Sequence, residues 1–550
     1  MQKKTLSILV CLVICFHAIS GTITVTTGNG SGAGSLKEAI LKANASTALD
    51  TIVFRGVEII KLTENLPVIT SRVVIDGGQD GVTIDADAKR SIFKLEYTPK
   101  LEEAYDSTFV VTLTRLTFIN GYANNGGAVW SRSPLVIDSC TFIDNMSIYG
   151  GGAICQELAT SMINLIVRNS IFTDNVSDKN LPNVSFRSGG GAIWCELQVD
   201  IDGCTFAGNQ SIQSKGGAVF TESGIYSGFG RYIRNSVFTG NKALSGGAIY
   251  GNGLYGFSIT NCRFSENEAK NDGGAYCGQS MGAIRCSFLN NKAGGNGGAV
   301  FAPDLHFENT TFYGNKAGKD GGAVYYSSLT HNQISLYFCT FTANEALGSS
   351  GAIRTPATHL SITVDNCILT GNRSVSQAND ANFECFISMY NCIYGEIGYF
   401  VQISNITKSV KATPKEVFGT DFPEADEDGV VKIIYDGPAD CKGTYNPSYN
   451  IDQLGNRRYP EYVSIGAWQL YHEGADLSSR LVHMDNVTVT GLARTLLIQT
   501  ERPAKVDVFT LTGQLVLQTT VQSGQTFLSV PAGFYVVRVN DRGWKVVVRN

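Results

Sequence analysis

The chain contains little proline, little charge and no excess of basic residues. With 13 prolines, 17% charged residues and a mean hydropathy of zero, it is too apolar for a disordered protein. Sixty glycines without a triplet period exclude collagen. The formal net charge is −5 and becomes −7 once a leader with two lysines is removed, so nucleic acid is not an expected partner. No apolar run after the N-terminus is long enough to span a bilayer.

Residues 1–20 are expected to form a secretory signal peptide. A short basic segment precedes an apolar stretch from Leu6 to Phe16, and small residues follow at the positions that a signal peptidase recognises. The apolar stretch is too short for a transmembrane helix, so the mature chain would begin near Gly21 without a membrane span. A lipoprotein signal that uses Cys11 or Cys15 is the alternative, although Val and Ile precede those cysteines.

One sequence unit recurs over residues 113–394. It reads Phe-x-x-Asn and is usually followed, eight to ten residues after the Phe, by Gly-Gly-Ala and a β-branched residue. Successive copies are 24 to 34 residues apart, a period that indicates a solenoid in which each unit buries its apolar face against its neighbours. Copies begin at Phe142, Phe172, Phe206, Phe238, Phe264, Phe288, Phe312 and Phe341, with degenerate copies at Phe118, Leu369 and Tyr394.

The spacing within the unit predicts where the backbone turns. A small residue lies two places before the Phe and a mainly apolar residue three places before that, as with Ile137, Cys140 and Phe142. Inward residues of one strand are separated by even numbers, so a step of three requires a corner. Asn or Gly, which tolerate positive φ, often fills the gap, as at Asn169. Further corners are expected at the Asn after the Phe and before Gly-Gly. The sequence therefore predicts an all-β, right-handed parallel β-helix over residues 113–394.

Stacked rungs would place equivalent residues about 4.8 Å apart. The Phe residues would then form a ladder inside the coil, and the Asn residues three places later would form a ladder of amides at a corner. Four places before the first Phe positions the charge alternates from rung to rung, which would favour the correct register. These residues are Asp138, Arg168, Asp202 and Arg234.

The Phe-x-x-Asn and Gly-Gly-Ala-[Ile/Val] unit resembles the repeats of the polymorphic outer membrane proteins, which are β-helical surface adhesins and autotransporters. The resemblance covers about half of the chain. It implies a protein that is secreted from a Gram-negative bacterium or anchored at its outer-membrane surface. It implies less about function, because the repeat residues form the scaffold. The chain departs from that family at its C-terminus, where no translocator domain is recognisable.

Residues 21–112 are expected to form an N-terminal cap and the first rungs. Ser35 to Glu38 is a capping box, and a helical apolar stripe overlaps it. Gly28-x-Gly30-x-x-Ala33 also satisfies a relaxed dinucleotide-binding pattern. The second strand, however, ends in Arg55 instead of an acid, so we expect no cofactor. The stripe consists of Leu36, Ala39, Ile40 and Ala43.

The C-terminal part of the chain lacks the repeat. Residues 395–472 are expected to supply irregular last rungs and a C-terminal cap, followed by a polar linker at 473–480. Residues 481–550 contain alternating strands between turns, which predicts a small β-sandwich. This region resembles the C-terminal sorting domain of the type IX secretion system, which implies that machinery as a partner. An ordinary immunoglobulin-like accessory domain is the alternative.

Twelve of the 14 cysteines lie outside the leader, and most of them share one slot of the repeat. Ser or Thr fills this slot in other copies, so we expect a stack of free, buried thiols that act as small filler. No Cys-x-x-Cys occurs, and Cys with His at zinc spacing is absent, so no metal is expected. The slot holds Cys140, Cys204, Cys262, Cys286, Cys339, Cys367 and Cys392.

Catalysis has to be weighed because β-helices also carry polysaccharide lyases and hydrolases. Asp144 and Asp174 share a slot on adjacent rungs, about 5 Å apart, but a corner position favours solvated acids. An active site built by long loops near 158–163 or 178–188 stays open. The histidines form no motif; after the leader they are His306, His331, His359, His472 and His483.

We therefore assign no catalytic, cofactor-binding or metal-binding residue. Two functions remain open. The first is an exported, surface-displayed adhesin or ligand-binding protein, without catalytic activity, whose partner is a host or environmental glycan or protein. The second is a polysaccharide lyase or glycoside hydrolase built on the same β-helix.

Overall fold

The computed structural model describes residues 21–96, 110–157, 164–177, 188–196, 198–222, 231–253, 256–328, 334–356, 361–376, 380–383, 386–397, 403–460, 462–470, 488–492, 495–500, 504–510, 515–522, 524–531, 533–539 and 542–548. The chain divides into two compact units, Met1–Tyr471 and His472–Asn550. The predicted signal peptide, 1–20, and the predicted linker, 473–480, lie outside the described residues.

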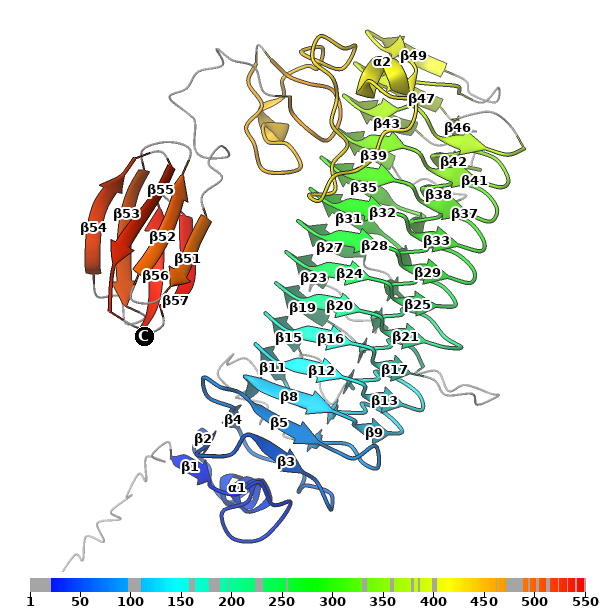
Figure 1. Ribbon diagram of the computed structural model, residues 1–550. Helices are drawn as coiled ribbons and strands as arrows, with labels where there is room; N and C mark the ends of the chain where they lie inside the picture. The colour runs from blue at the N-terminus through cyan, green and yellow to red at the C-terminus, as the bar shows by residue number, and fades with distance from the viewer. Residues whose placement is uncertain are drawn as a thin grey trace, which may run out of the picture. The chain divides into compact units, whose positions relative to one another are not determined.

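The first unit is a coil of parallel strands that form four sheets (Figure 1). Sheet A has 15 strands, from β1 (Thr22–Val25) to β49 (Ile403–Thr407), and sheet B has 14, from β3 (Ile59–Lys61) to β50 (Val410–Lys411). Sheet C has 11 strands, between β6 (Phe93–Leu95) and β46 (Ala381–Phe383). Sheet D has ten two-residue strands, between β9 (Tyr122–Ala123) and β45 (Arg373–Ser374).

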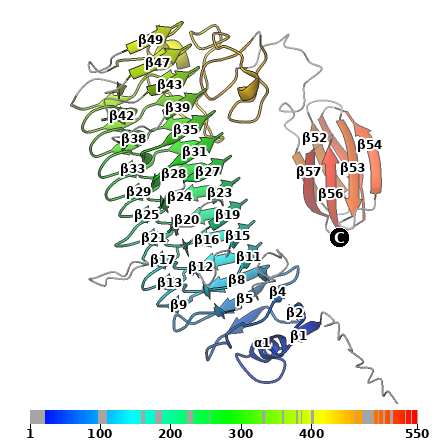
Figure 2. The ribbon, with the colours of Figure 1, turned by 180° about the vertical axis from the view of Figure 1, so that it is seen from behind.

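One rung visits the sheets in the order A, B, D, C. It runs through β27 (Phe257–Thr260), β28 (Arg263–Ser265), β29 (Glu268–Ala269) and β30 (Tyr276–Gly278), and the next rung starts with β31 (Met281–Ile284). Each strand pairs in parallel with its equivalents in the rungs before and after it, as β28 does with β24 (Val237–Thr239) and β32 (Ser287–Leu289). This arrangement, seen from behind in Figure 2, confirms the predicted parallel β-helix.

The corners lie close to where the spacing places them. Between sheets A and B the gap residue has positive φ, for example 48° at Asn169 and 54° at Asn261. At the second corner the positive φ belongs to the residue before the ladder Asn, such as Asp144 at 53°, and not to the Asn itself. The reason is that the Asn side chain must point inward to reach the neighbouring rungs, so the residue before it makes the turn. At the third corner the first Gly of Gly-Gly has positive φ, as Gly246 does at 64°.

The predicted Phe ladder fills the coil. Consecutive rings from Phe118 to Phe341 are stacked, with centroid separations between 4.5 and 4.9 Å. The repeat Phe residues are fully buried in one continuous core. Because each ring packs on the ring of the neighbouring rung, the ladder favours one register between successive rungs.

The predicted Asn ladder is also present, and its members from Asn145 to Asn344 are buried. Asn175 Oδ1 accepts hydrogen bonds from the backbone N and the Nδ2 of Asn145, at 3.1 and 2.9 Å. Asn175 Nδ2 donates to the carbonyl of Phe142 at 3.0 Å and to Asn209 Oδ1 at 2.9 Å. Each amide after Asn145 thereby uses both donors and both acceptor positions, so the ladder supplies corner hydrogen bonds that backbone groups alone leave unmade.

A carboxyl group closes this ladder at its C-terminal end. Asp380 Oδ1 accepts from the backbone N and the Nδ2 of Asn372, at 2.6 and 3.1 Å. Asp380 Oδ2 accepts from the backbone N of Glu396 at 2.8 Å. Burial raises the pKa of Asp380 to about 6.

This raised pKa predicts a pH dependence of stability. Between pH about 4, where a free Asp ionises, and pH about 6, the folded chain keeps a proton on Asp380 that the unfolded chain has lost. The free energy of unfolding should therefore fall by about 2 kcal/mol as the pH rises through this window. Asp380→Asn should remove that part of the slope in urea unfolding at pH 4.5 and pH 7. Identical slopes for the two proteins would contradict the assignment.

The N-terminal end is capped as predicted. Helix α1 (Leu36–Asn44) begins after Ser35, whose Oγ accepts from the backbone N of Glu38 at 3.3 Å, and the predicted stripe is its buried face. The Gly28 and Gly30 pattern is explained by packing. A Cβ on Gly28 would lie 2.4 Å from the carbonyl oxygen of Ile59, and one on Gly30 would lie 2.7 Å from Thr63 Oγ1.

The C-terminal region of the first unit does more than continue the coil. After β49 and β50, helix α2 (Pro414–Phe418) ends at Gly419, and residues 419–470, which we call the return segment, contact earlier rungs (Figure 1). Gln453 Nε2 donates to Ser287 Oγ at 3.0 Å, and the backbone N of Ala467 donates to Thr340 Oγ1 at 3.0 Å. The expected irregular rungs are thus replaced, over most of this range, by a segment laid against the outside of sheet B.

Arg458 fixes the return segment from within. The side chain is fully buried and lies 4.2 Å from the ring centroid of Phe338. Its Nη2 donates to Asn309 Oδ1 at 3.0 Å and to the carbonyl of Gly466 at 2.8 Å, and its Nη1 donates to the carbonyl of Ser464 at 3.0 Å. One cation therefore holds two stretches of the segment and a corner of the β-helix together.

We expect Arg458→Met to release the return segment without unfolding the rungs. The substitution leaves several buried acceptors without a donor, which costs about 3 kcal/mol and should raise the rate of proteolytic cleavage within 419–470 about 100-fold. Arg457→Met is the matched control, because Arg457 is the exposed neighbour. Equal cleavage rates in the two variants, measured by limited proteolysis and mass spectrometry, would show that Arg458 does not hold the segment.

The second unit is a small antiparallel β-sandwich. Strands β51 (Thr488–Leu492), β52 (Thr495–Thr500) and β55 (Gly524–Ser529) form one sheet. The other sheet consists of β54 (Leu515–Val521), β53 (Ala504–Thr510), β56 (Gly533–Val539) and β57 (Arg542–Val548). Buried residues of both sheets, including Leu496, Val508 and Val537, share one core. The predicted strands and sandwich are confirmed.

Candidate functional site

The two acids considered from the sequence occupy equivalent positions on consecutive rungs. Strand β12 (Thr141–Ile143) pairs with β16 (Ile171–Thr173), so Asp144 and Asp174, which follow them, are stacked. Both side chains are exposed and both residues have φ of 53°. Both acids lie at a solvated corner, and Gly208 occupies the equivalent position in the next rung. They are therefore turn residues, and they do not form a pair of carboxylates that face each other across a substrate.

Besides Asp380, two carboxyl groups that the sequence did not single out, Glu308 and Asp365, have raised pKa values. Glu308, Tyr337 and Asp365 are consecutive members of one outward row on sheet A. Burial raises the pKa of Glu308 and raises that of Asp365 to about 6. Two rungs separate the carboxyls by about 10 Å, and Tyr337 fills the position between them. The ring of Tyr449 from the return segment stacks on Tyr337 at 4.6 Å, so this row is a packing contact.

Of the histidines, the structure describes only His306. It lies on the same strand as Glu308, with its ring 5.8 Å from that of Tyr337, and burial lowers its pKa. The other histidines after the leader, His331, His359, His472 and His483, lie outside the described residues, as do nearly all of the loops 158–163 and 178–188, where the sequence leaves an active site open.

The cysteine slot holds free, buried thiols, as expected. The structure adds that these thiols donate hydrogen bonds: Cys140 Sγ lies 3.4 Å from the carbonyl oxygens of Leu113 and Asp138. This explains why Ser and Thr alternate with Cys, since Ser170 Oγ makes the equivalent bond to the carbonyl of Arg168 at 2.6 Å. Burial raises the pKa of Cys140 and Cys204 to about 12, so these thiols are poor nucleophiles and metal ligands.

An outward aromatic row on sheet C was missed by the sequence reasoning. Its members follow Ala-[Val/Ile] in the repeat, and that position was the available signal. The rings of Phe220 and Tyr250 stack at 5.5 Å, and Lys215 Nζ lies 4.4 Å from the Tyr250 centroid. The exposed part of the row is limited, because Trp194 is fully buried. The aromatic members of the row are Trp130, Trp194, Phe220, Tyr250, Phe301 and Tyr325, and Cys155 and Cys277 interrupt it.

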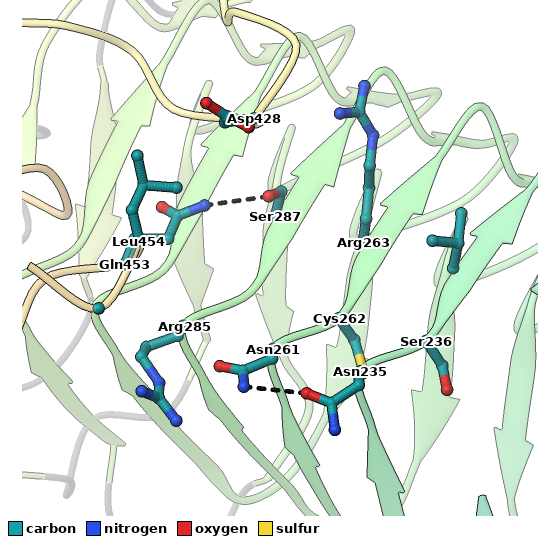
Figure 3. Close-up of a pocket in the computed structure, with 12 residues that line it drawn as sticks. Asn235, Ser236, Asn261, Cys262, Arg263, Arg285, Ser287, Asp428, Gln453 and Leu454 are labelled. Atoms are coloured by element: carbon teal, nitrogen blue, oxygen red, sulfur yellow. Dashed lines mark hydrogen bonds between the residues drawn. The ribbon is translucent and has the colours of Figure 1, made fainter. Parts of the chain in front are cut away.

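A recess of about 420 Å³ lies where the return segment meets the corner between sheets A and B (Figure 3). Three successive rungs supply Asn235, Asn261 and Arg285, which share one corner slot, and the return segment supplies Asp428 and Gln453. Asn261 Nδ2 donates to Asn235 Oδ1 at 3.0 Å. Arg285 occupies the equivalent position in the next rung, so a guanidinium interrupts the row of amides at this recess.

Cationic groups lie on two sides of this recess. In Figure 3, Arg263 and Asp428 lie on one side of the recess, whereas Arg285 lies beside Asn261 on the opposite side. Arg263 Nη1 donates to the carbonyl of Glu427. The lining contains two guanidinium groups and one carboxylate, so its charge balance is positive although the chain has a net charge of −5. It can bind an anion through charge-assisted hydrogen bonds.

Within the described part of the chain, no group of three or more His, Cys, Asp or Glu side chains is arranged to hold a metal ion. A search of the same residues finds no helix with the length and apolar character that a membrane crossing requires.

Four segments of the chain match the Chlamydia polymorphic membrane protein repeat: residues 203–222, 235–252, 285–303 and 309–327. Each segment contains one repeat Phe and the Gly-Gly-Ala that follows it. No curated protein matches the chain. The chain therefore carries polymorphic membrane protein repeats, folded as a β-solenoid, and these support placement at the outer-membrane surface.

Proposed function

We propose that this protein is an exported surface protein that binds a ligand without chemically changing it, as an adhesin does. The observation that carries the proposal is the repeat itself. Four of its copies match a repeat of surface proteins, and the copies fold into a long, regular coil. A coil of this kind offers repetitive outer faces for binding, and its corners carry side chains that vary from rung to rung.

The export route in this proposal combines the N-terminal signal peptide with the type IX secretion machinery, which would recognise residues 481–550. The support is that the described residues of this region form an antiparallel sandwich within a compact unit of their own. The segment 1–20 would direct the first step, across the inner membrane.

The export proposal is tested in a Gram-negative bacterium that has a type IX system. The full chain should become accessible to protease added to intact cells, and removal of residues 481–550 should retain it in the periplasm. As a control, the same deletion in a strain without the type IX system should have no further effect. Surface display of the shortened chain would contradict a sorting role for this domain.

The binding proposal is tested with the full chain on arrays of glycans and matrix proteins, together with assays for polysaccharide cleavage. Saturable binding with no change in the bound glycan is the expected result. The release of unsaturated products or new reducing ends would instead support the second candidate, a polysaccharide lyase or glycoside hydrolase.

A further inference from the structure

We propose that the recess beside the return segment binds an acidic saccharide through its carboxylate groups, with Arg285 as the main cationic contact and Arg263 as the second. The inference rests on the proposed ligand-binding function and gives it a site and a ligand class.

Arg285 is the first reason. It occupies, at a φ of 55°, the corner slot that holds Asn235, Asn261 and Asn309 in neighbouring rungs. A residue with a large side chain is uncommon in this left-handed conformation, and such positions concentrate at functional sites.

The other large side chains in this slot have partners within the chain. Arg115 forms an ion pair with Asp76, and Phe338 packs against Arg458. Among the described residues the Arg285 guanidinium makes no hydrogen bond or ion pair, although it interacts electrostatically with Glu308, and its Nε–H is buried without an acceptor. A buried donor without a partner requires an explanation, and a ligand that accepts its hydrogen bond provides one.

The rest of the lining indicates an anionic ligand rich in hydroxyl groups. The lining also contains the side-chain amides of Asn235 and Asn261, and Val237 and Leu454 add small apolar contacts. The Gln453 amide is already bonded within the chain, to Ser287 Oγ, Thr311 Oγ1 and the carbonyl of Gly429. A guanidinium binds a carboxylate through two parallel hydrogen bonds, while amides can bind hydroxyl groups. The volume of about 420 Å³ lies within the range of small-molecule sites.

A saccharide fits this recess better than an acidic peptide. Strand β28 at the floor of the recess is paired on both edges, with β24 and β32, so an extended peptide has no free edge to join. The lining also lacks a deep apolar pocket that would select a peptide side chain. Recognition must therefore occur through side chains arranged along the rungs, which suits a short, hydroxylated, carboxylate-bearing chain.

The test measures binding of oligogalacturonate to the full chain by isothermal titration calorimetry, with a neutral malto-oligosaccharide and a polyglutamate peptide as comparison probes. Arg285→Asn removes the cation and installs the residue that neighbouring rungs carry, so the fold should be retained. Arg168→Gln is the matched control, because it removes an exposed positive charge outside the recess. We expect Arg285→Asn to weaken binding at least tenfold, Arg263→Gln to weaken it less, and Arg168→Gln to leave it unchanged.

Several outcomes would overturn the inference. These are undiminished binding by Arg285→Asn with an unchanged circular dichroism spectrum, equal binding of the neutral probe, and preferential binding of polyglutamate. If the wild-type chain is displayed at the cell surface and binds another array ligand but no acidic saccharide, this inference fails while the proposed function stands. If the chain neither reaches the surface nor binds any ligand, the proposed function itself fails.

Discussion

Replacement of Gly247 by Ala is expected to break the β-helix in two. Gly247 is the second Gly of its Gly-Gly pair, where successive rungs come closest. A Cβ at this position would lie 2.1 Å from the carbonyl oxygen of Gly274 and 2.7 Å from backbone atoms of Glu268. These atoms belong to paired backbone, which cannot move aside as a flexible side chain can. Relief would require the rungs to separate and to lose their shared hydrogen bonds.

We expect this substitution to cost about 4 kcal/mol or more, at the upper end for single substitutions. A solenoid is stabilised mainly by contacts between nearest neighbours, so weakening one interface should uncouple the rungs before it from those after it. Urea unfolding followed by far-ultraviolet circular dichroism should therefore show an earlier midpoint and two transitions instead of one.

Gly282→Ala is the matched control for this prediction. Gly282 lies in β31, and a Cβ there would meet no atom within 4 Å. Ala should be neutral or stabilise the chain by about 0.5 kcal/mol, because it reduces the entropy of the unfolded state. If Gly247→Ala unfolds at the same urea concentration as Gly282→Ala, close packing is not the reason for the Gly-Gly pair.

The sequence was sufficient to predict the coil because local and repeated signals coincide there. The Phe ladder, the Asn ladder and the corner between sheets A and B each depend on residues at fixed spacing, and one copy of the unit supports the next. The buried face of α1 was predicted residue by residue for a related reason, since a capping box and a helical stripe overlap within nine residues.

The return segment could not be predicted in the same way. Its contacts join residues far apart in sequence, such as Gln453 with Ser287, 166 residues away. The segment has neither the repeat nor a hydrophobic period, so nothing local reveals which surface it covers. The recess depends on this contact, and the sequence analysis did not identify it. The one signal in the sequence is Arg285, which stands where neighbouring copies of the repeat carry Asn.

The Asn ladder gives the second large prediction, made for a rung in its middle. Asn267 is fully buried, and its Oδ1 accepts from the backbone N and the Nδ2 of Asn241, at 3.0 and 2.9 Å. Its Nδ2 donates to the carbonyl of Phe238 and to Asn291 Oδ1, both at 2.9 Å. Asn267→Ala removes all four hydrogen bonds and leaves two N–H donors of Asn241 buried without an acceptor.

An unsatisfied buried donor costs about 1–3 kcal/mol, so Asn267→Ala should lower the free energy of unfolding by about 3–5 kcal/mol. Glu266→Gly is the control on the adjacent residue: Glu266 is exposed, has a φ of 58°, and is replaced by Gly240 in the preceding rung. That change should stabilise the chain slightly, because Gly adopts positive φ without strain. Urea unfolding of both variants measures the change in the free energy of unfolding that each substitution causes. Similar small effects from the two substitutions would show that corner geometry, and not the continuous row of buried amides, keeps the rungs in register.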